Sequence, residues 1–274
     1  MVKIALLLLL ALPTQAFAFG PAIQAVLSTS SSAGVDSFCD SCPDAAAGAD
    51  VFCEDCNTGA ATGVCEWTKV EAGGDTGTIS FAASPDNSPA LGCTDIGMTY
   101  AVQVLKANTT AGATYAYKGF TEDALYIQFY IKIAAEGLAD TDTAILMAIN
   151  NGTDTSAWLM LYQQSGALRF TLLHYAGSGY TSDMGGTNVT ADTWYGVRIY
   201  LNNPSGGGSD AIRWWVDYSN NGTWTEEGNY TSLTFNYTTT RFNIGHIENL
   251  SKTLSYFISG LKVDNDTMPT ACTR

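Results

Sequence analysis

Apolar and polar side chains alternate along residues 125–133, and this alternation constrains the fold more than any other feature of the chain. Leu125, Ile127, Phe129, Ile131 and Ile133 would share one face of an extended strand, with the residues between them on the other face. Further strand-like runs, separated by clusters of Gly, Asn, Asp, Ser and Thr, lie at 144–149, 157–164, 167–175, 194–202, 211–218, 232–237, 241–247 and 254–263. This spacing predicts an all-β fold, an antiparallel β-sandwich.

The turn residues support the same architecture. Asn221-Gly222 follows the run that ends at Asp217-Tyr218, and this dipeptide is typical of a type I′ hairpin turn. Helical periodicity is limited to single turns at 122–125 and 134–138. The chain has 274 residues, of which 46% are hydrophobic, and this is enough to form a hydrophobic core.

The charge balance narrows the possible partners. The formal net charge is −14, from 12 Lys and Arg against 26 Asp and Glu, which argues against a nucleic-acid partner because such proteins need a basic surface. The one long apolar run is N-terminal: Lys3 precedes the run 4–12, and the small-x-small cleavage pattern Ala16-Phe17-Ala18 follows it. This is the plan of a secretory signal peptide over 1–18. We expect a secreted protein, extracellular or at the cell surface, with no transmembrane segment after signal cleavage.

The segments after the signal peptide differ in composition. Residues 19–38 read as an extension or linker, 39–66 as a cysteine-rich segment leading into the first strand, and 67–274 as the β-sandwich domain. The exported part holds all the cysteines: Cys39, Cys42, Cys53, Cys56, Cys65, Cys93 and Cys272. In an oxidising compartment, disulfides are favoured over a zinc knuckle built from the two C-x2-C pairs. Their connectivity stays open, and the odd number leaves one thiol for a free or intermolecular role.

Several short segments resemble strands of one superfamily. They lie at 51–55, at 190–197 (opening Thr-Ala-Asp-Thr-Trp), at 215–217 (Trp-Val-Asp), at 241–245 and at 258–264. Together they are similar to the concanavalin A-like lectin/glucanase jelly roll, and especially to its laminin-G-like domains. The resemblance covers about 51–265 and implies a jelly-roll sandwich, a fold that serves lectins, glycoside hydrolases, polysaccharide lyases and adhesion modules.

The polar faces of the expected strands suggest a glycan-binding surface. Aromatic rings stack on sugar faces and guanidinium groups pair with carboxylates or hydroxyls. The candidate glycan-binding residues are Tyr126, Gln128, Tyr130, Arg169, Trp194, Arg198, Arg213 and Trp215. The alternative is an ordinary solvent-exposed sheet face with no binding role, where aromatic and long basic side chains are also common.

Catalytic signatures of the fold are mostly missing. The sequence has no E-x-D-x-x-E strand and no Q-x-H strand, and Glu226-Glu227 would point to opposite faces in a solvated hairpin. His174 is expected on the core side of its strand, more in keeping with a structural role than with a base at the groove rim. We therefore name no catalytic residue and leave enzyme activity open, leaning against it. The alternative is a polysaccharide lyase or hydrolase that uses Tyr126, Tyr130, Arg169, His174 and Arg198.

A cofactor is not required, although calcium is possible. The resemblance implies that loop aspartates can hold one Ca²⁺, and the available acidic groups are Asp264 with Asp266, Asp140 with Asp142, and Asp210. Exposed loop aspartates without a metal are the alternative, so the metal stays unknown.

Glycosylation sequons are the clearest non-random feature. Eight of the fifteen asparagines begin N-x-S/T, where roughly three would arise by chance: Asn108, Asn151, Asn188, Asn221, Asn229, Asn236, Asn249 and Asn265. An Asn- and Thr-rich turn composition is the alternative explanation.

We expect a secreted, glycosylated, non-catalytic sandwich that contacts a glycan or another surface protein. A further alternative is self-assembly into an extracellular filament, in which residues 19–38 of one subunit add a strand to the next.

Overall fold

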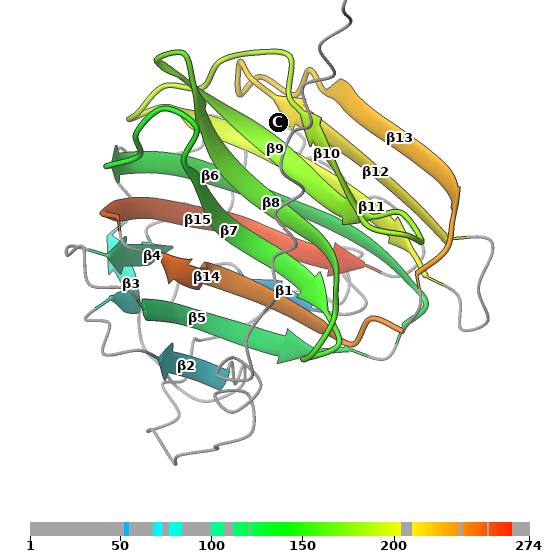
Figure 1. Cartoon of the computed structure of the whole chain (residues 1–274). Coiled ribbons are helices and arrows are strands. Elements are labelled where there is room, and N and C mark those ends of the chain that lie inside the picture. The colour runs from blue at the N-terminus through cyan, green and yellow to red at the C-terminus, as the bar shows by residue number, and fades with distance from the viewer. Residues whose placement is uncertain are drawn as a thin grey trace, which may run out of the picture. The chain divides into compact units, whose positions relative to one another are not determined.

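The structure is a computed structural model that describes residues 52–54, 68–72, 77–83, 100–106, 112–120, 122–203, 210–235, 238–250 and 252–264. Every regular element in these residues is a β-strand (Figure 1). The expected signal peptide, the extension 19–38 and all cysteines except Cys53 lie outside the described residues.

One sheet has eight strands, paired antiparallel throughout. Its order is β13-β12-β11-β6-β15-β4-β3, and β1 pairs with β15 beside this path. The strands are β1 (Phe52–Glu54), β3 (Thr78–Ala83), β4 (Tyr100–Lys106), β6 (Ala124–Glu136), β11 (Trp194–Asn202), β12 (Asp210–Asp217), β13 (Thr225–Leu233) and β15 (Leu254–Asp264). β13 and β3 are the edges of this path.

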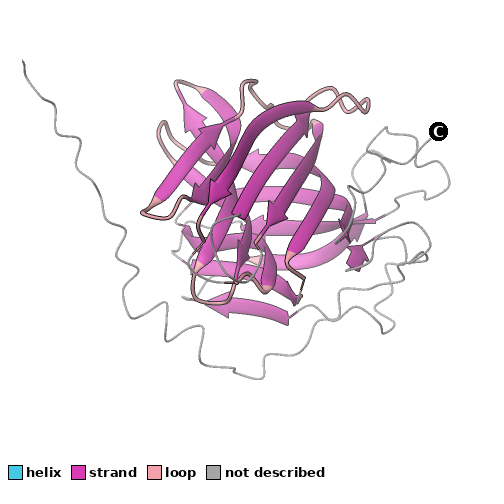
Figure 2. Ribbon diagram, turned by 90° about the vertical axis from the view of Figure 1, so that its right-hand side faces the viewer, coloured by secondary structure: helices cyan, strands magenta, loops and turns pink. Residues whose placement is uncertain are grey.

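The second sheet has seven strands in the order β10-β9-β8-β7-β14-β5-β2. They are β2 (Thr68–Ala72), β5 (Gly112–Gly119), β7 (Thr143–Asn150), β8 (Thr155–Gln164), β9 (Ala167–Tyr175), β10 (Tyr180–Met184) and β14 (Arg241–Leu250). The two sheets stack as two layers (Figure 2). The expected antiparallel β-sandwich is therefore confirmed.

A single large core lies between the sheets. It joins side chains from both layers, such as Phe129 of β6, Leu159 of β8, Phe170 of β9 and Trp214 of β12. The five apolar residues predicted to share one face of 125–133 are at most 1% exposed. Because side chains alternate along a strand, the residues between them must lie on the outer face of the eight-stranded sheet.

The register of β6, β11 and β12 places the outer-face residues in rows. Each row runs across the strands: Tyr126, Tyr200 and Arg213; Gln128, Arg198 and Trp215; Tyr130, Gly196 and Asp217. Directly opposed residues in antiparallel strands have Cβ atoms about 5 Å apart. The pairing alone therefore brings together side chains that are up to about ninety positions apart in the sequence.

The β12–β13 hairpin forms, but its turn differs from the expected type I′ turn at Asn221-Gly222. A longer loop, 218–224, joins the strands, and positive φ angles occur at Asn220 (50°) and Gly222 (88°) rather than at two adjacent residues. The Asp217 carboxylate organises this loop. It accepts hydrogen bonds from the backbone N–H of Ser219 (3.2 Å) and of Gly222 (2.6 Å), so the loop wraps around the carboxylate.

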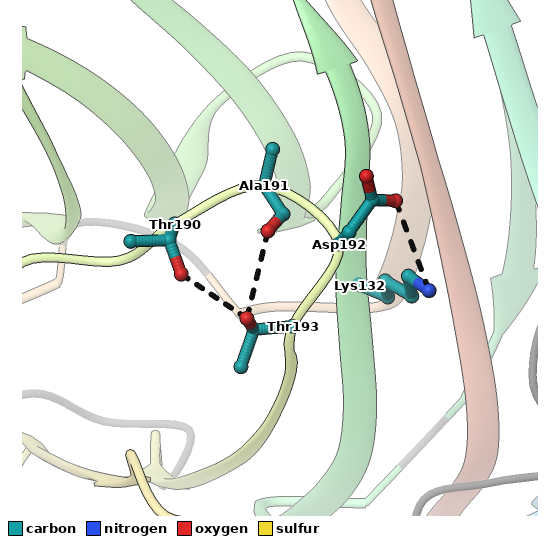
Figure 3. A network of polar contacts seen from close by, with 5 residues as sticks. All are labelled: Lys132, Thr190, Ala191, Asp192 and Thr193. Carbon is teal, nitrogen blue, oxygen red and sulfur yellow. Dashed lines mark hydrogen bonds and ion pairs between the residues drawn. The ribbon is translucent and has the colours of Figure 1, made fainter.

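A compact loop sets the start of β11 (Figure 3). Thr193 Oγ1 lies 3.1 Å from Thr190 Oγ1, and the backbone N–H of Asp192 donates to Ile133 O at 2.8 Å. Asp192 adopts φ 60°, in the left-handed region. Its carboxylate lies 3.8 Å from Nζ of the buried Lys132, so the loop is attached to β6 by both backbone and side chain.

Candidate functional site

A hollow of about 520 Å³ opens on the outer face of the eight-stranded sheet. Its lining consists of four aromatic side chains and two arginines: Tyr126, Tyr200, Trp215, Trp224, Arg198 and Arg213. Strands β6, β11 and β12 supply five of these residues, and the β12–β13 loop supplies Trp224. This volume falls in the ordinary range of small-ligand sites.

Arg198 occupies a fixed position in this hollow. Its Nε donates to Gln128 Oε1 at 2.7 Å, and its guanidinium carbon lies 3.9 Å from the ring centroid of Trp224. Burial lowers the pKa of Arg198, and the nearby Tyr130 and Asp217 oppose that effect. The guanidinium nevertheless stays charged at neutral pH, because its ordinary pKa is so high. A stacked and hydrogen-bonded arginine is a pre-positioned donor.

Trp224 reaches this position because Gly196 has no side chain. A Cβ atom built at Gly196 would lie 2.7 Å from the Trp224 ring and 3.2 Å from Cβ of Asp217. The indole therefore lies over a gap in the β11 row. Because Asp217 also anchors the loop that carries Trp224, one carboxylate positions the wall of the hollow.

Arg213 forms an exposed ion pair. One guanidinium nitrogen lies 2.5 Å from Glu226 Oε2, and the two side chains are 39% and 38% exposed. The hydrogen bond from Arg213 is the main reason that the pKa of Glu226 is lowered. The Arg213 guanidinium carbon lies 4.9 Å from the Trp215 ring, and among the described residues its buried Nε has no hydrogen-bond partner.

Two tyrosines complete the lining on the side away from Trp224. The rings of Tyr126 and Tyr200 have centroids 4.7 Å apart and are tilted by 31°. Burial, and then the neighbouring Tyr126, raise the pKa of Tyr200. A phenol hydroxyl can donate and accept hydrogen bonds beside a flat apolar ring.

Half of the predicted glycan-binding residues line the hollow: Tyr126, Arg198, Arg213 and Trp215. Gln128 lies beneath them and is 1% exposed, so it supports Arg198 and is not itself accessible. Tyr130 and Trp194 are packed with Phe257 in a small outer cluster. Burial raises the pKa of Tyr130 to about 12.

Arg169 does not belong to this surface. It lies on β9 of the seven-stranded sheet, where Nε donates to Asn188 Oδ1 at 3.0 Å. Alternation predicts the face of a strand on which a residue lies, but not the sheet to which the strand belongs. Trp224, in contrast, was missed by sequence reasoning, because a loop has no periodicity from which its direction can be predicted.

His174 lies between the two sheets and not at the hollow. It is 1% exposed, its ring centroid lies 4.2 Å from that of Tyr230, and burial lowers its pKa. The residues of the enzyme alternative are therefore separated: His174 lies in the interior, Arg169 on the other sheet, and Tyr130 in the outer aromatic cluster. They do not form one catalytic site.

Polar side chains meet where the edge strands β10 and β13 approach each other. Asp183 of β10 accepts the indole N–H of Trp214 at 2.8 Å and also bonds the hydroxyl of Tyr230, whose pKa is raised mainly by burial. Glu227, half-buried on β13, accepts the backbone N–H of Gly186 at 2.7 Å. Glu226 and Glu227 thus contact different partners, Arg213 and Gly186, from a strand that is largely exposed.

The candidate calcium ligands are engaged in other contacts. Asp142 pairs with Lys252 at 2.8 Å, Asp140 accepts the backbone N–H of Ser165, and Asp210 accepts that of Phe235. Only the backbone of Asp264 is described, and Asp266 lies outside the described residues. No group of three or more His, Cys, Asp or Glu side chains within the described part is arranged to hold a metal ion.

The sequons that can be placed lie mainly on accessible loops and edges. Asn188, Asn221 and Asn229 are exposed, and Asn151 is half-buried. The remaining sequon side chains lie outside the description: Asn108, Asn236, Asn249 and Asn265. Asn229 is notable because its partner across β12 and β13 is Arg213.

The described residues contain no helix that is long and apolar enough to cross a membrane. Neither a protein-family model nor a curated protein matches the sequence.

Solved structures with a similar arrangement exist. A cellulose-induced protein, Cip1, is 11% identical with a TM-score of 0.46, over 74% of this chain and 93% of that one. The globular domain of calreticulin from T. cruzi is 10% identical with a TM-score of 0.48, over 79% and 89%. The lumenal domain of VIP36, in a form bound to Ca²⁺ and mannose, is 8% identical with a TM-score of 0.43, over 76% and 86%.

Because these TM-scores are all below 0.5, the fold is argued from the chain's own strand order and register and not from these structures. Two antiparallel sheets enclose one core, with sequence-distant strands such as β6 and β15 as neighbours. The antiparallel β-sandwich expected from the sequence is therefore confirmed, and the concanavalin A-like resemblance stays a prediction.

Proposed function

We propose that the chain is a secreted, non-catalytic carbohydrate-binding β-sandwich that acts at the cell surface or in an extracellular assembly. The observation that carries this proposal is the hollow lined by Tyr126, Tyr200, Trp215, Trp224 and two arginines. Sugar rings have apolar C–H faces that pack on aromatic rings, and their hydroxyls accept hydrogen bonds from guanidinium groups. Secretion is supported by the signal-peptide pattern of residues 1–18.

The geometry favours binding over catalysis. Near the hollow, the Asp217 carboxylate accepts hydrogen bonds from its own loop, and Glu226 is paired with Arg213. The phenol of Tyr130, with a pKa of about 12, is a poor base at neutral pH. Fixed aromatic walls and pre-positioned donors are the features of a recognition site.

The test is affinity electrophoresis of the mature protein through gels that contain neutral or acidic polysaccharides. Retardation by at least one polysaccharide is expected, together with its loss in W215A and W224A. The matched control is Y180A, because Tyr180 is an exposed aromatic residue on the other sheet. Equal retardation of all three variants, or no retardation of the wild type, would refute the proposal. Release of an unsaturated product that absorbs ultraviolet light would refute its non-catalytic part.

A further inference from the structure

We propose that the hollow recognises a short saccharide through a single carboxylate, held by Arg213 with Arg198 beside it. This inference rests on the proposed carbohydrate-binding function. The ligand class is a mostly neutral oligosaccharide that carries one uronic acid residue, whose ring packs against the tryptophans.

The two guanidinium groups are placed to act together. Arg198 lies opposite Trp215 in the β11–β12 register, and Arg213 is two residues from Trp215 on the same face. Diagonal neighbours of this kind lie about 7–8 Å apart, and their Cβ atoms somewhat less. Side chains as long as arginine can therefore converge on one carboxylate, whose two oxygens match the planar fork of a guanidinium.

The acidic groups nearby leave this position open to a ligand. The Asp217 carboxylate already accepts hydrogen bonds from Ser219 and Gly222, which fixes it inside the loop. Glu226 holds Arg213 in an ion pair in which both partners are more than a third exposed. Pairs of this kind contribute little to stability, so a ligand carboxylate can replace Glu226.

The charge of the whole chain limits the ligand to a single carboxylate. With a formal net charge of −14, the protein repels a polyanion at long range. A single carboxylate between neutral sugars experiences mainly the two local arginines, since distant charges are screened beyond about 10 Å at moderate salt. At low salt, where the net charge is little screened, the chain therefore disfavours a long polyuronate relative to one isolated acidic sugar.

The experiment measures binding by isothermal titration calorimetry with three matched probes. They are a disaccharide with a terminal glucuronic acid, its methyl ester, and the corresponding disaccharide with glucose. We expect the acid to bind about tenfold or more tightly than the ester, because a charge-assisted hydrogen bond is lost in the ester. R213M should remove this preference, whereas R169M, on the other sheet, should retain it.

A gain of affinity gives the sharpest readout. In E226Q the competing carboxylate is gone from Arg213, so affinity for the acid should rise about 1.5- to 5-fold while affinity for the ester stays unchanged. Equal binding of acid and ester, or no rise in E226Q, overturns the single-carboxylate inference. Polygalacturonate that binds more tightly than the disaccharide at low salt also overturns it. If W224A still weakens the binding of every saccharide in these cases, the proposed carbohydrate-binding function survives. If no saccharide binds the wild type, both the proposed function and the single-carboxylate inference fail.

Discussion

Substituting Gly196 with alanine should displace the wall of the hollow without changing the identity of any residue that lines it. The new methyl group would lie 2.7 Å from the Trp224 ring. Carbon atoms in contact prefer about 3.5–4.0 Å. The indole must therefore move by roughly 1 Å or swing away, since β11 is held by β6 and β12 on both sides.

The energetic cost follows from the contacts that the displaced indole gives up. Trp224 stacks on Arg198 at 3.9 Å, and a cation–π contact of this kind contributes about 0.5–2 kcal/mol depending on solvation. The Cβ atom of Asp217, 3.2 Å from the new methyl group, adds a smaller strain. We expect G196A to lower the free energy of unfolding by about 1–3 kcal/mol. Saccharide affinity should fall, by no more than in W224A, because the indole is displaced and not removed.

A double-mutant cycle measured by urea denaturation tests the cause. If the cost of G196A comes from the indole, the same substitution in a W224A background should cost much less than in the wild type. Coupling between positions 196 and 224 should then reach about 1 kcal/mol. An equal cost of G196A in both backgrounds, or a fully stable G196A that binds saccharide normally, would show that the indole does not depend on the glycine.

Further expected results concern the core, the interior histidine and the sequon at the hollow. Phe129→Ala should cost about 3–5 kcal/mol in urea denaturation because its ring is fully buried, and an equally stable variant would contradict the core assignment. Burial lowers the pKa of His174 from 6.5, so the unfolded chain takes up that proton first. The free energy of unfolding should therefore fall as pH drops below about 6.5, by at most about 1.4 kcal/mol per pH unit, and H174Q should flatten this slope. In protein from a glycosylating host, N229Q should bind saccharide more tightly than the wild type, because Asn229 pairs with Arg213, and N188Q should not. Unoccupied Asn229 by mass spectrometry, or identical binding, would contradict this.

The sequence predicts well where each side chain of a strand lies relative to the core. Along β6 the alternation alone assigns Phe129 to the interior and Tyr126 to the outer surface, because the period of a strand is two and only one face is buried. Tyr130 shows the limit of the same rule. It lies on the outer face as expected, yet Trp194 and Phe257 bury it.

The composition of the hollow was less predictable, because it depends on contacts between distant parts of the chain. Trp224 is positioned by the absence of a side chain at Gly196 and by the carboxylate of Asp217. The Asn221-Gly222 dipeptide predicted a hairpin correctly, but the carboxylate imposed a longer loop. Arg169 lies on the other sheet from the hollow, and local alternation contains no information on which strands become neighbours.

The meeting of β10 and β13 also determines where the sandwich could grow. Both are edge strands. Asp183 of β10 accepts the indole N–H of Trp214, which lies on β12, the neighbour of β13. Charged side chains on an edge, here Glu226 and Glu227, discourage another strand from pairing there. A strand contributed by residues 19–38 of a neighbouring subunit would therefore add at the opposite edge, β3, whose segment Thr78–Ala83 carries no charged residue. Any filament built in this way would elongate from one side of each subunit and be blocked at the other.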